Sequence, residues 1–334
     1  MTVSVVIATY NGERYLSEQI DSVLAQTLNP DEIIVSDDGS TDGTWKILEE
    51  YKAKYPKLFR LYHNEGEHGA HNNFKYAFQF VTCDLVAPCD QDDIWMPEKL
   101  ERSVAALQEG ISLVFCQEKI RHENGEEKSL PHMMPTLYQS IFYNDIFGHL
   151  MVCRREVLEL FAVAPEMTYD WGMALYAAID NSGIGIDYEG CVWRRHVGVV
   201  TSFFSDKNPV KLEQISKWKK WWRALRMTAK GSKSEVIARR MHSIYTIMEW
   251  RRIEGAVLRG TKVYDMLSAC IDVATCIEQQ TPKSIWHASF VYVNIIRHQD
   301  DFKHCTLCEK IGKVFYAFCY PAMYWYDYHE YDSL

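Results

Sequence analysis

The stretch Asp84-Leu85-Val86-Ala87-Pro88-Cys89-Asp90-Gln91-Asp92-Asp93-Ile94-Trp95-Met96-Pro97 joins an apolar run to three carboxylates within four residues. The apolar run predicts a buried strand, and Pro97 predicts the opening of a helix. Like charges at a strand tip repel one another unless a cation lies between them. Oxygen ligands suit Mg²⁺ or Mn²⁺ bound to substrate phosphates. A solvated acidic turn that caps the next helix is the alternative, because aspartates are common before helices.

Strand and helix patterns alternate before this stretch. Short apolar runs predict strands over residues 3–9, 32–36 and 59–63, and a helical pattern follows each run, the first one at 16–24. This alternation predicts a doubly wound α/β fold, with a mostly parallel central sheet and helices on both of its faces.

Polar residues follow three of the predicted strands. Tyr10 and Asn11 follow the first, Asp37-Asp38-Gly39-Ser40 follows the second, and the acidic stretch follows the fourth. Ligands bind beyond the carboxyl ends of the strands in such sheets. A stacking ring, a hydrogen-bonding aspartate and a metal-binding acidic cluster together predict a nucleoside-diphosphate site. No G-x-G-x-x-G follows the first strand and the chain has no P-loop motif, which argues against dinucleotide dehydrogenases and P-loop enzymes.

Four motifs in this order resemble the inverting family 2 glycosyltransferases, which have the GT-A fold. They are Val5 to Gly12, Leu24 to Thr27, Asp37 to Asp42, and the Asp-Gln-Asp-Asp-Ile-Trp motif at 90–95. The last motif is similar to the bacterial rhamnosyltransferase-like branch, which builds surface polysaccharides. The resemblance covers residues 1–205 and implies a GT-A catalytic domain there, while helical patterns predict a helical C-terminal region over 206–334.

The resemblance implies a donor site for a nucleotide-diphosphate sugar, with dTDP- and UDP-sugars as the first candidates. Tyr10 would stack on the base, and Asp38 would hydrogen-bond the base. Asp90 would lie near the ribose and the metal, and Asp92 would be the principal ligand of Mn²⁺ or Mg²⁺ in a DXD motif. Asn73 would line the donor pocket, or it caps the helix that carries Phe74. The other donor-side residues in this prediction are Ala8, Asn11 and Gln91.

The segment at Arg194-Arg195-His196 resembles the arginine-x-histidine segment of the family. The resemblance implies that His196 reaches the metal or the pyrophosphate, and an imidazole ligand would favour Mn²⁺ over Mg²⁺. Arg194 or Arg195 could neutralise the leaving diphosphate, because a guanidinium matches phosphate oxygens. An exposed basic pair is the alternative.

Thr168-Tyr169-Asp170-Trp171 resembles the helix-opening acidic motif whose aspartate is the general base. Asp170 would take the proton of the acceptor hydroxyl as that oxygen attacks C1 of the sugar opposite the nucleotide, which inverts the configuration. The alternative is an N-cap for a helix over 171–179. His149 and Trp171 are acceptor-side candidates, although His149 also fits a core or surface histidine.

Charge is unevenly distributed along the chain. The net charge of −9 argues against a general nucleic-acid binder, yet residues 207–262 carry 15 Lys and Arg against 4 Asp and Glu. Trp and Lys or Arg interleave over 217–226, which predicts an interfacial helix on an anionic membrane or a helix packed on the catalytic domain. The aromatic run at 315–326 predicts a docking tail, a homo-oligomer contact or a shallow membrane contact.

The N-terminus has no signal-peptide pattern, and no apolar run reaches the roughly 18 residues that span a bilayer. We therefore expect a cytoplasmic protein, with peripheral contact to the inner face of the cytoplasmic membrane. The ten cysteines lie in mostly apolar surroundings and predict reduced core thiols. The Cys305-Thr306-Leu307-Cys308 pair has no second pair at a zinc-site spacing.

These predictions combine into a metal-dependent inverting glycosyltransferase of bacterial surface polysaccharide synthesis. It would move a sugar, with rhamnose as a candidate, to a hydroxyl of a glycan or a polyprenyl-diphosphate-linked glycan. A sugar nucleotidyltransferase is one alternative, but its glycine-rich basic loop is absent after the first strand. A catalytically inactive binding or scaffold subunit is another. Gly172 and Val199 keep it open, because they stand where the family usually has tryptophan and asparagine.

Overall fold

The computed structural model describes residues 1–142, 144–195, 235–253, 262–279 and 281–297, with isolated positions at 306, 310, 313, 314 and 321. The described residues form two compact units. The first contains residues 1–135, 144–162 and the chain from 168 to the end of the last strand. The second contains residues 136–142, 163–167 and the helices after residue 234.

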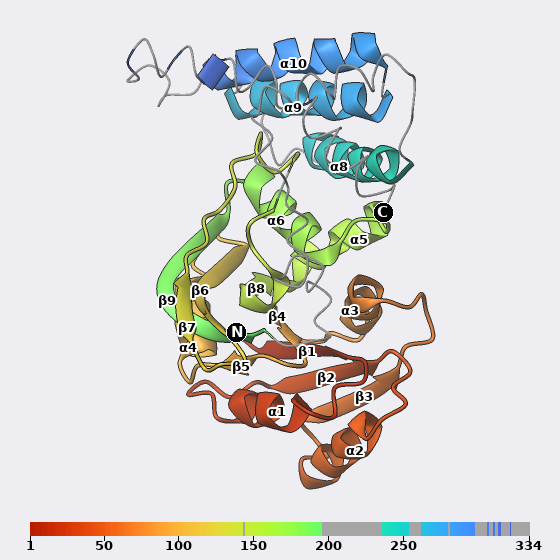
Figure 1. Cartoon of the computed structure of the whole chain (residues 1–334), viewed down its shortest axis with the longest axis vertical. Helices are drawn as coiled ribbons and strands as arrows, with labels where there is room; N and C mark the ends of the chain where they lie inside the picture. The colour runs from red at the N-terminus through yellow and green to blue at the C-terminus, as the bar shows by residue number, and fades with distance from the viewer. Residues whose placement is uncertain are drawn as a thin grey trace. The chain divides into compact units, whose positions relative to one another are not determined.

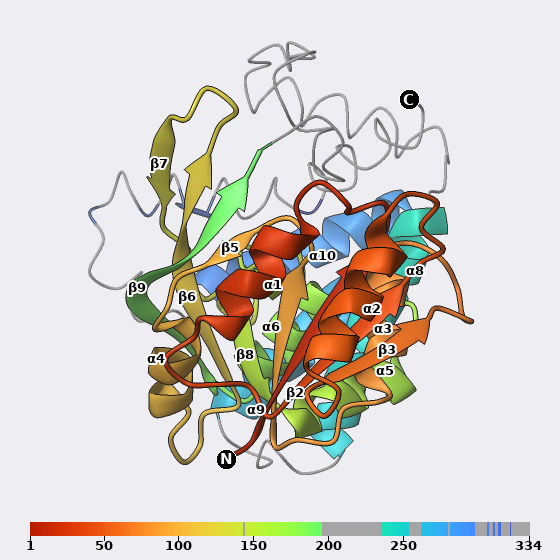
Figure 2. The same cartoon turned by 90° about the horizontal axis from the view of Figure 1, so that it is seen from below.

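Parallel strands and covering helices build the first half of the first unit. The strands are β1 (Val3–Thr9), β2 (Glu32–Asp37), β3 (Phe59–His63) and β4 (Leu85–Asp90), and the helices are α1 (Leu16–Leu24), α2 (Thr44–Lys54) and α3 (Ala70–Phe78). Strand β1 pairs in parallel with both β2 and β4, and β2 pairs in parallel with β3. Helices α1 and α2 cover one face of these strands and α3 covers the other (Figures 1 and 2). The doubly wound prediction is confirmed.

The second half of this unit makes the sheet mixed. Its elements are β5 (Ile94–Trp95), α4 (Lys99–Ala106), β6 (Leu113–Arg121), β7 (Glu127–Leu130), η1 (Gly148–Leu150), β8 (Met151–Arg154), η2 (Arg155–Glu159), α5 (Leu160–Val163), α6 (Tyr169–Ile179) and β9 (Gly183–Arg194). The strand order is β3-β2-β1-β4-β8-β6-β9-β5, with β7 paired to β6. Strand β8 runs antiparallel to both of its neighbours, so β6 again runs parallel to β4.

One local prediction changes in detail. The helix after the acidic turn begins at Lys99 rather than at Pro97, because β5 intervenes and pairs antiparallel to β9. Strands β6 and β7 form a hairpin, and Gly125 at its turn has a φ of 83°, which favours glycine.

The strand core explains why the N-terminal strands lie at the centre of the sheet. Val5, Val6 and Ile7 of β1 are fully buried, and so are Ile33 and Ile34 of β2. A strand covered by helices on both faces needs a continuous apolar run, and each fully buried side chain contributes about 1.5–3 kcal/mol. This burial sets the register that aligns the polar ends of the strands.

The second unit is helical in its described part. It contains α8 (Glu235–Ile253), α9 (Lys262–Gln279) and α10 (Pro282–Arg297), which confirms the predicted helical pattern after residue 235. Tyr292 packs edge-on against Phe142, with ring centroids 5.0 Å apart. None of the helices in the described residues is long and apolar enough to cross a bilayer. The basic helix at 217–226, Cys305 and Cys308, and all of the aromatic run at 315–326 except position 321 lie outside the described residues.

The cysteines within the described residues are reduced thiols, as the sequence predicts. Six of them are buried: Cys83, Cys89, Cys116, Cys153, Cys191 and Cys270. Burial raises the pKa of Cys153 and Cys270, which suits core side chains rather than reactive thiols.

Candidate active site

The polar ends of three strands meet at one edge of the sheet. Strand β1 lies between β2 and β4, so that Ala8 pairs with Asp90 and Thr9 pairs with Asp37. Tyr10, directly after β1, is 56% exposed. The structure therefore brings the predicted stacking ring and the predicted acidic cluster to one edge, as expected for a parallel sheet.

The carboxylates of the acidic turn differ sharply in exposure. The Asp90 side chain is 38% exposed and Asp92 is half-buried, whereas the Asp93 side chain is fully buried. Asp93 Oδ1 accepts a hydrogen bond from the backbone N–H of Arg194 over 3.3 Å. Asp90 and Asp92 can therefore offer oxygen atoms to a ligand, while Asp93 faces the interior.

Arg194 braces the acidic turn against helix α1. Its side chain is 10% exposed and donates to the backbone carbonyl of Asp92 and to the Glu18 carboxylate. The guanidinium also lies over the Tyr15 ring, 4.8 Å from its centroid. The alternative of an exposed basic pair is wrong for Arg194, because its donors hold protein groups. Contact with a diphosphate stays a prediction.

The two residues after Arg194 complete this predicted segment. Arg195 is half-buried, and its guanidinium lies 4.6 Å from the centroid of the Trp193 ring. His196, the third predicted metal ligand, lies outside the described residues. Its ligand role therefore stays a prediction, as does the diphosphate role of Arg195.

The Gln91 side chain pairs with the backbone of Tyr10 in the manner of a neighbouring strand. The Tyr10 N–H donates to Gln91 Oε1 over 2.9 Å, and Gln91 Nε2 donates to the Tyr10 carbonyl over 3.0 Å. A Cβ atom on Gly12 would lie 2.3 Å from Gln91 Oε1, so glycine leaves room for the amide. Gln91 thus holds the loop that carries the predicted stacking ring, whereas its predicted donor contact stays a prediction.

Asp38 holds the loop between β3 and α3. Its carboxylate accepts hydrogen bonds from Asn64 Nδ2 at 2.6 Å and from the Gly69 N–H at 2.7 Å, and His68 Nδ1 lies 2.9 Å away. The Asp38 side chain is 9% exposed. The predicted hydrogen bond to a base stays a prediction, and any such bond would share these oxygens.

Asn11 and Asn73 also hold the strand ends together. Asn11, at a φ of 49°, accepts a hydrogen bond from the Thr41 N–H over 2.8 Å. Asn73 is 2% exposed, and its Nδ2 donates to the carbonyls of Ser36 and Thr9 over 2.9 and 3.3 Å. The N-cap alternative for Asn73 is wrong, because α3 begins at Ala70 with Gly69 at the cap position. Asn73 therefore ties α3 to the ends of β1 and β2.

A buried series of ionisable side chains behind Asp90 was not predicted from the sequence. His149 Nδ1 lies 3.1 Å from Asp90 Oδ2, and His149 Nε2 lies 2.8 Å from Glu118 Oε2. Glu118 Oε1 in turn lies 2.9 Å from His132 Nε2, and His132 Nδ1 donates to the carbonyl of Asp145 over 2.6 Å. A glutamate within the apolar strand run at 113–118 was the signal that could have revealed it.

Glu118 and His149 shift one another's pKa in opposite directions. Burial raises the pKa of Glu118, but the charges and hydrogen bonds of His149 and His132 outweigh burial and lower it to about 2. Burial lowers the pKa of His149, but the facing carboxylates of Asp93 and Glu118 raise it well above its ordinary value. Each ring nitrogen of His149 therefore carries a proton toward a carboxylate.

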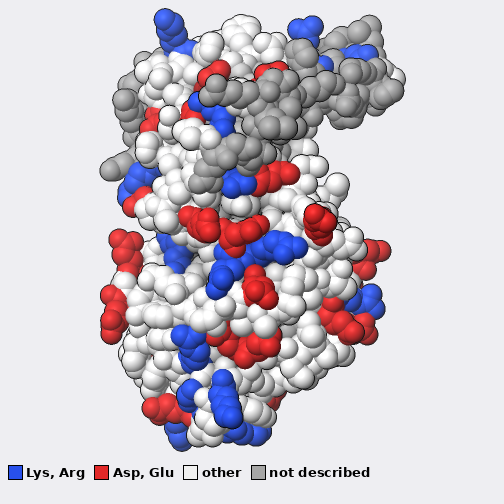
Figure 3. Space-filling model, turned by 180° about the vertical axis from the view of Figure 1, so that it is seen from behind, with Lys and Arg blue, Asp and Glu red and all other residues white. Residues whose placement is uncertain are grey.

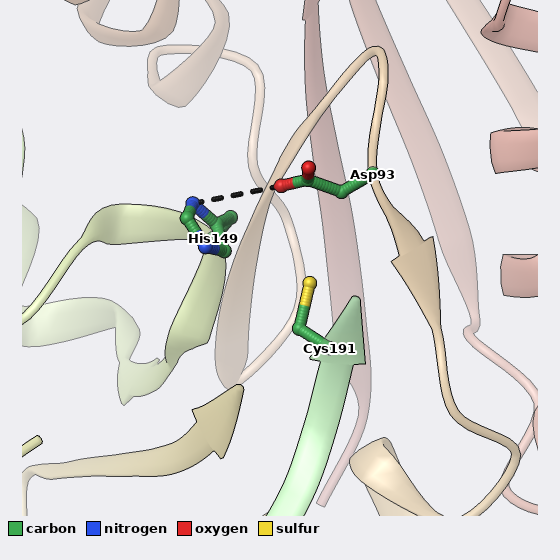
Figure 4. Close-up of side chains that lie close together, drawn as sticks. All are labelled: Asp93, His149 and Cys191. Atoms are coloured by element: carbon green, nitrogen blue, oxygen red, sulfur yellow. Dashed lines mark ion pairs between the residues drawn. The ribbon is translucent and has the colours of Figure 1, made fainter. Parts of the chain in front are cut away.

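Cys191 lies beside this ion pair. Figure 4 shows the His149 ring facing Asp93, with the Cys191 thiol beneath them, and Asp93 Oδ2 is 3.7 Å from His149 Nδ1. The three side chains have the types of a metal site, with ligand atoms within 4.8 Å of one another. Both nitrogens of His149 face carboxylates, however, and burial raises the pKa of Cys191 well above its usual value. Burial also raises the pKa of Asp93 well above its usual value, so we interpret this trio as a buried polar contact beside a protonated thiol.

Helix α6 brings Asp170 toward the same region. Its N-cap residue is Thr168, so the N-cap alternative for Asp170 is wrong, and Asp170 lies half-buried in the first turn. The Asp170 Oδ1 atom accepts the N–H of Trp171, whose side chain is buried with 8% exposure. The acceptor contact of Trp171 stays a prediction.

Tyr169 connects Asp170 with Asp90. Burial raises the pKa of the Tyr169 phenol well above its usual value, and the charges of Asp90 and Asp170 add to this shift. The ring lies against Gly148, where a Cβ atom would stand 2.1 Å from the Tyr169 hydroxyl oxygen. Gly148 precedes His149, whose Nδ1 atom lies 3.1 Å from Asp90 Oδ2, so the start of α6 packs on the segment that contacts the acidic turn.

Comparison with known proteins agrees with this geometry. The family model described as Glycosyl transferase family 2 matches residues 4–161. An uncharacterised protein of Mycobacterium tuberculosis is 31% identical over 217 residues, which are 61% of this chain and 62% of that protein. The chain thus spans less than two thirds of this mycobacterial relative.

One characterised relative and one solved structure add to the comparison. WfgD of Escherichia coli, a UDP-Glc:alpha-D-GlcNAc-diphosphoundecaprenol beta-1,3-glucosyltransferase, is 31% identical over 54% of this chain and 71% of its own length. Residues 1–349 of S. aureus TarS, solved in complex with UDP-GlcNAc, have the same fold, with a TM-score of 0.52 and 18% identity over 96% of this chain and 90% of that one. The ordered motifs, the mixed GT-A sheet and these matches lead to one conclusion: the chain belongs to glycosyltransferase family 2.

Proposed function

We propose that this chain transfers a sugar from a nucleotide-diphosphate sugar to a hydroxyl group, with inversion at the anomeric carbon. The observation that carries the proposal is geometric: Tyr169, next to Asp170 in α6, lies against Gly148, and the adjacent His149 has its Nδ1 atom 3.1 Å from Asp90 Oδ2. A donor bound at that edge and a base at the start of α6 could then act on opposite faces of one sugar. The domain boundary we propose is at residue 205, with the catalytic part before it.

The donor side would use the exposed groups of this edge. Tyr10 offers an exposed ring for stacking on the base. Asp90 and Asp92 would hold Mn²⁺ or Mg²⁺, and two partly exposed carboxylates fit a hard divalent cation. Such an ion, when bound, supplies positive charge that stabilises the leaving diphosphate.

The acceptor side would use Asp170. Its carboxylate takes the proton of the incoming hydroxyl as the new glycosidic bond forms, and the nucleotide diphosphate leaves with the electrons of the broken bond. We propose a glycan or polyprenyl-diphosphate-linked glycan as acceptor, in surface polysaccharide synthesis, which the likeness to WfgD supports. The Asp-Gln-Asp-Asp-Ile-Trp motif supports rhamnose as the sugar.

We also propose a cytoplasmic location with peripheral contact to an anionic membrane. The support is the basic excess over residues 207–262, part of which lies outside the described residues. On the face in Figure 3, the acidic and basic side chains of the described residues are interspersed. The membrane proposal therefore depends on the basic segment and not on that face.

A thermal-shift panel tests the donor half of the proposal. Wild-type protein is mixed with UDP-, dTDP- and GDP-sugars, each with and without Mn²⁺. A donor at about 100 times its Kd stabilises the folded state by about 2.7 kcal/mol, which raises Tm by roughly 5–10 °C. Asp92→Ala should lose the part of the shift that needs Mn²⁺. Equal shifts in both proteins would contradict the role of Asp92.

A transfer assay tests the catalytic half. Asp170→Asn should lower the transfer rate by about 10²–10⁴-fold while the donor-induced shift in Tm persists. The matched control is Asp180→Asn, because Asp180 is also half-buried but lies at the opposite end of α6. The anomeric configuration of the product, measured by NMR, checks inversion. Full turnover by Asp170→Asn, or retention of configuration, would refute this mechanism.

A further inference from the structure

Glu118 is a fully buried carboxylate that holds two histidines. Its side chain has no exposed surface, and its two oxygens lie 2.8 Å from His149 Nε2 and 2.9 Å from His132 Nε2. A buried charge is costly unless partners compensate it, and a pair that spans two elements also fixes the positions of those elements. Glu118 on β6 thus holds η1, which carries His149, and the segment before η1, which carries His132.

His149 transmits this restraint to the acidic turn. Its Nδ1 atom lies 3.1 Å from Asp90 Oδ2, so the ring bridges a buried carboxylate and a partly exposed one. The backbone of His149 is held as well, because the buried Lys99 Nζ donates to its carbonyl over 2.6 Å. Both the ring and the backbone of His149 are therefore fixed.

Asp90 needs such a restraint because of its neighbours. It stands two residues from Asp92, and like charges this close repel. The His149 ring behind Asp90 holds one of its carboxylate oxygens, Oδ2, at 3.1 Å from Nδ1. The Asp90 side chain remains 38% exposed.

We propose that Glu118 is a positioning residue that acts through His149 to hold the Asp90 carboxylate ready for a cation–nucleotide complex. This inference rests on the proposed function, because it assigns Asp90 to that complex. His132 extends the same series of contacts to the carbonyl of Asp145, so these two residues are linked to the donor edge through Glu118. Outer partners of metal ligands typically change metal affinity by about 10–100-fold when they are lost.

A matched control is available within the same sheet. Glu32 of β2 is also a buried carboxylate, and it accepts hydrogen bonds from Ser4, Arg60 and Thr82. It lies near the start of its strand, whereas the donor residues follow the strand ends. Glu32→Gln should therefore lower stability without acting on Asp90.

The experiment measures Mn²⁺ binding by EPR in the presence of UDP and, separately, of dTDP. Glu118→Gln removes the charge that orients His149 and should weaken Mn²⁺ binding by about 10–100-fold. Glu32→Gln should leave the affinity within about twofold of wild type, although both variants lose Tm. A folded Glu118→Gln protein that binds Mn²⁺ as tightly as wild type would overturn the inference. Equal weakening in both variants would do the same, because it would indicate a general loss of stability.

His132→Gln keeps the test decisive if Glu118→Gln does not fold. It removes one partner of Glu118 and leaves the His149 contact in place, so we expect weakening near the lower end, about tenfold. Unchanged affinity in folded His132→Gln would then refute the coupling. Failure of the proposed function is a different result: wild-type protein would bind Mn²⁺ no better with either nucleotide than without one, and the inference would be rejected together with it.

Discussion

The contact between Gln91 and Tyr10 allows a quantitative test of how the donor edge is held. The Gln91 amide exchanges two hydrogen bonds with the backbone of Tyr10, at 2.9 and 3.0 Å. The site is partly exposed, so each bond contributes at the lower end of the usual range, about 0.5 kcal/mol. Gln91→Ala should therefore cost about 1 kcal/mol and lower Tm by roughly 2–4 °C.

Gly12→Ala should disrupt the same contact by displacing the Gln91 amide. The added Cβ would lie 2.3 Å from Gln91 Oε1 and 2.8 Å from Gln91 Cδ, so the amide must move away and lose both bonds. Alanine for glycine at a compatible backbone also stabilises by about 0.4–1 kcal/mol through the unfolded chain. That gain is the same whether residue 91 is glutamine or alanine.

The double-mutant cycle isolates the contact. Gly12→Ala should be about 1 kcal/mol more favourable in the Gln91→Ala background than in wild type, because the amide is no longer there to displace. Urea denaturation of the four proteins measures the difference, with the m-value as a check that the unfolded state is unchanged. If Gly12→Ala changes the free energy of unfolding equally in both backgrounds, the proposed contact between Gln91 and the Tyr10 backbone is refuted.

Further predictions concern packing and pH. Gly148→Ala would place a methyl group 2.1 Å from the Tyr169 hydroxyl oxygen, and the ring is buried beside Phe74 with centroids 4.4 Å apart. It should therefore cost about 1–3 kcal/mol in urea denaturation, and wild-type stability would contradict this packing. Burial raises the pKa of Glu32, but hydrogen bonds from Ser4, Thr82 and Arg60 outweigh it and lower the pKa to about 2. This stability is fully present above about pH 4.5 and is lost as the pH falls toward 2, so Glu32→Gln should flatten the stability curve in that window. If Glu32→Gln leaves the slope of stability against pH unchanged in that window, Glu32 does not cause this pH dependence.

The strand ends could be predicted because their signals are local. Apolar runs mark β1, β2 and β4, and parallel pairing brings the residues after such runs to one edge. Tyr10, Asp38 and Asp90 were therefore placed together from the sequence, and the motif order led to the family that the comparisons confirm. The helix that begins near Asp170 was predicted in the same way, to within two residues.

The identity of each side chain's partner was decided by the tertiary structure. Gln91 and Tyr10 are 81 positions apart, and Arg194 reaches Glu18 across 176. No periodicity in the sequence links residues so distant. Gln91 and Arg194 were predicted on the donor side from the sequence, and the structure adds the protein groups that each of them holds.

Burial separates the acidic residues in the same way. The sequence determined that Asp90, Asp92 and Asp93 lie at a strand end, because their spacing along the chain is sufficient for that. It could not tell that Asp93 and Glu118 are buried while Asp90 reaches the surface, since burial depends on β8, β6 and β9 packing together. The physical reason is that the charge state and role of a carboxylate depend on what surrounds it in space, and those neighbours come from distant parts of the chain.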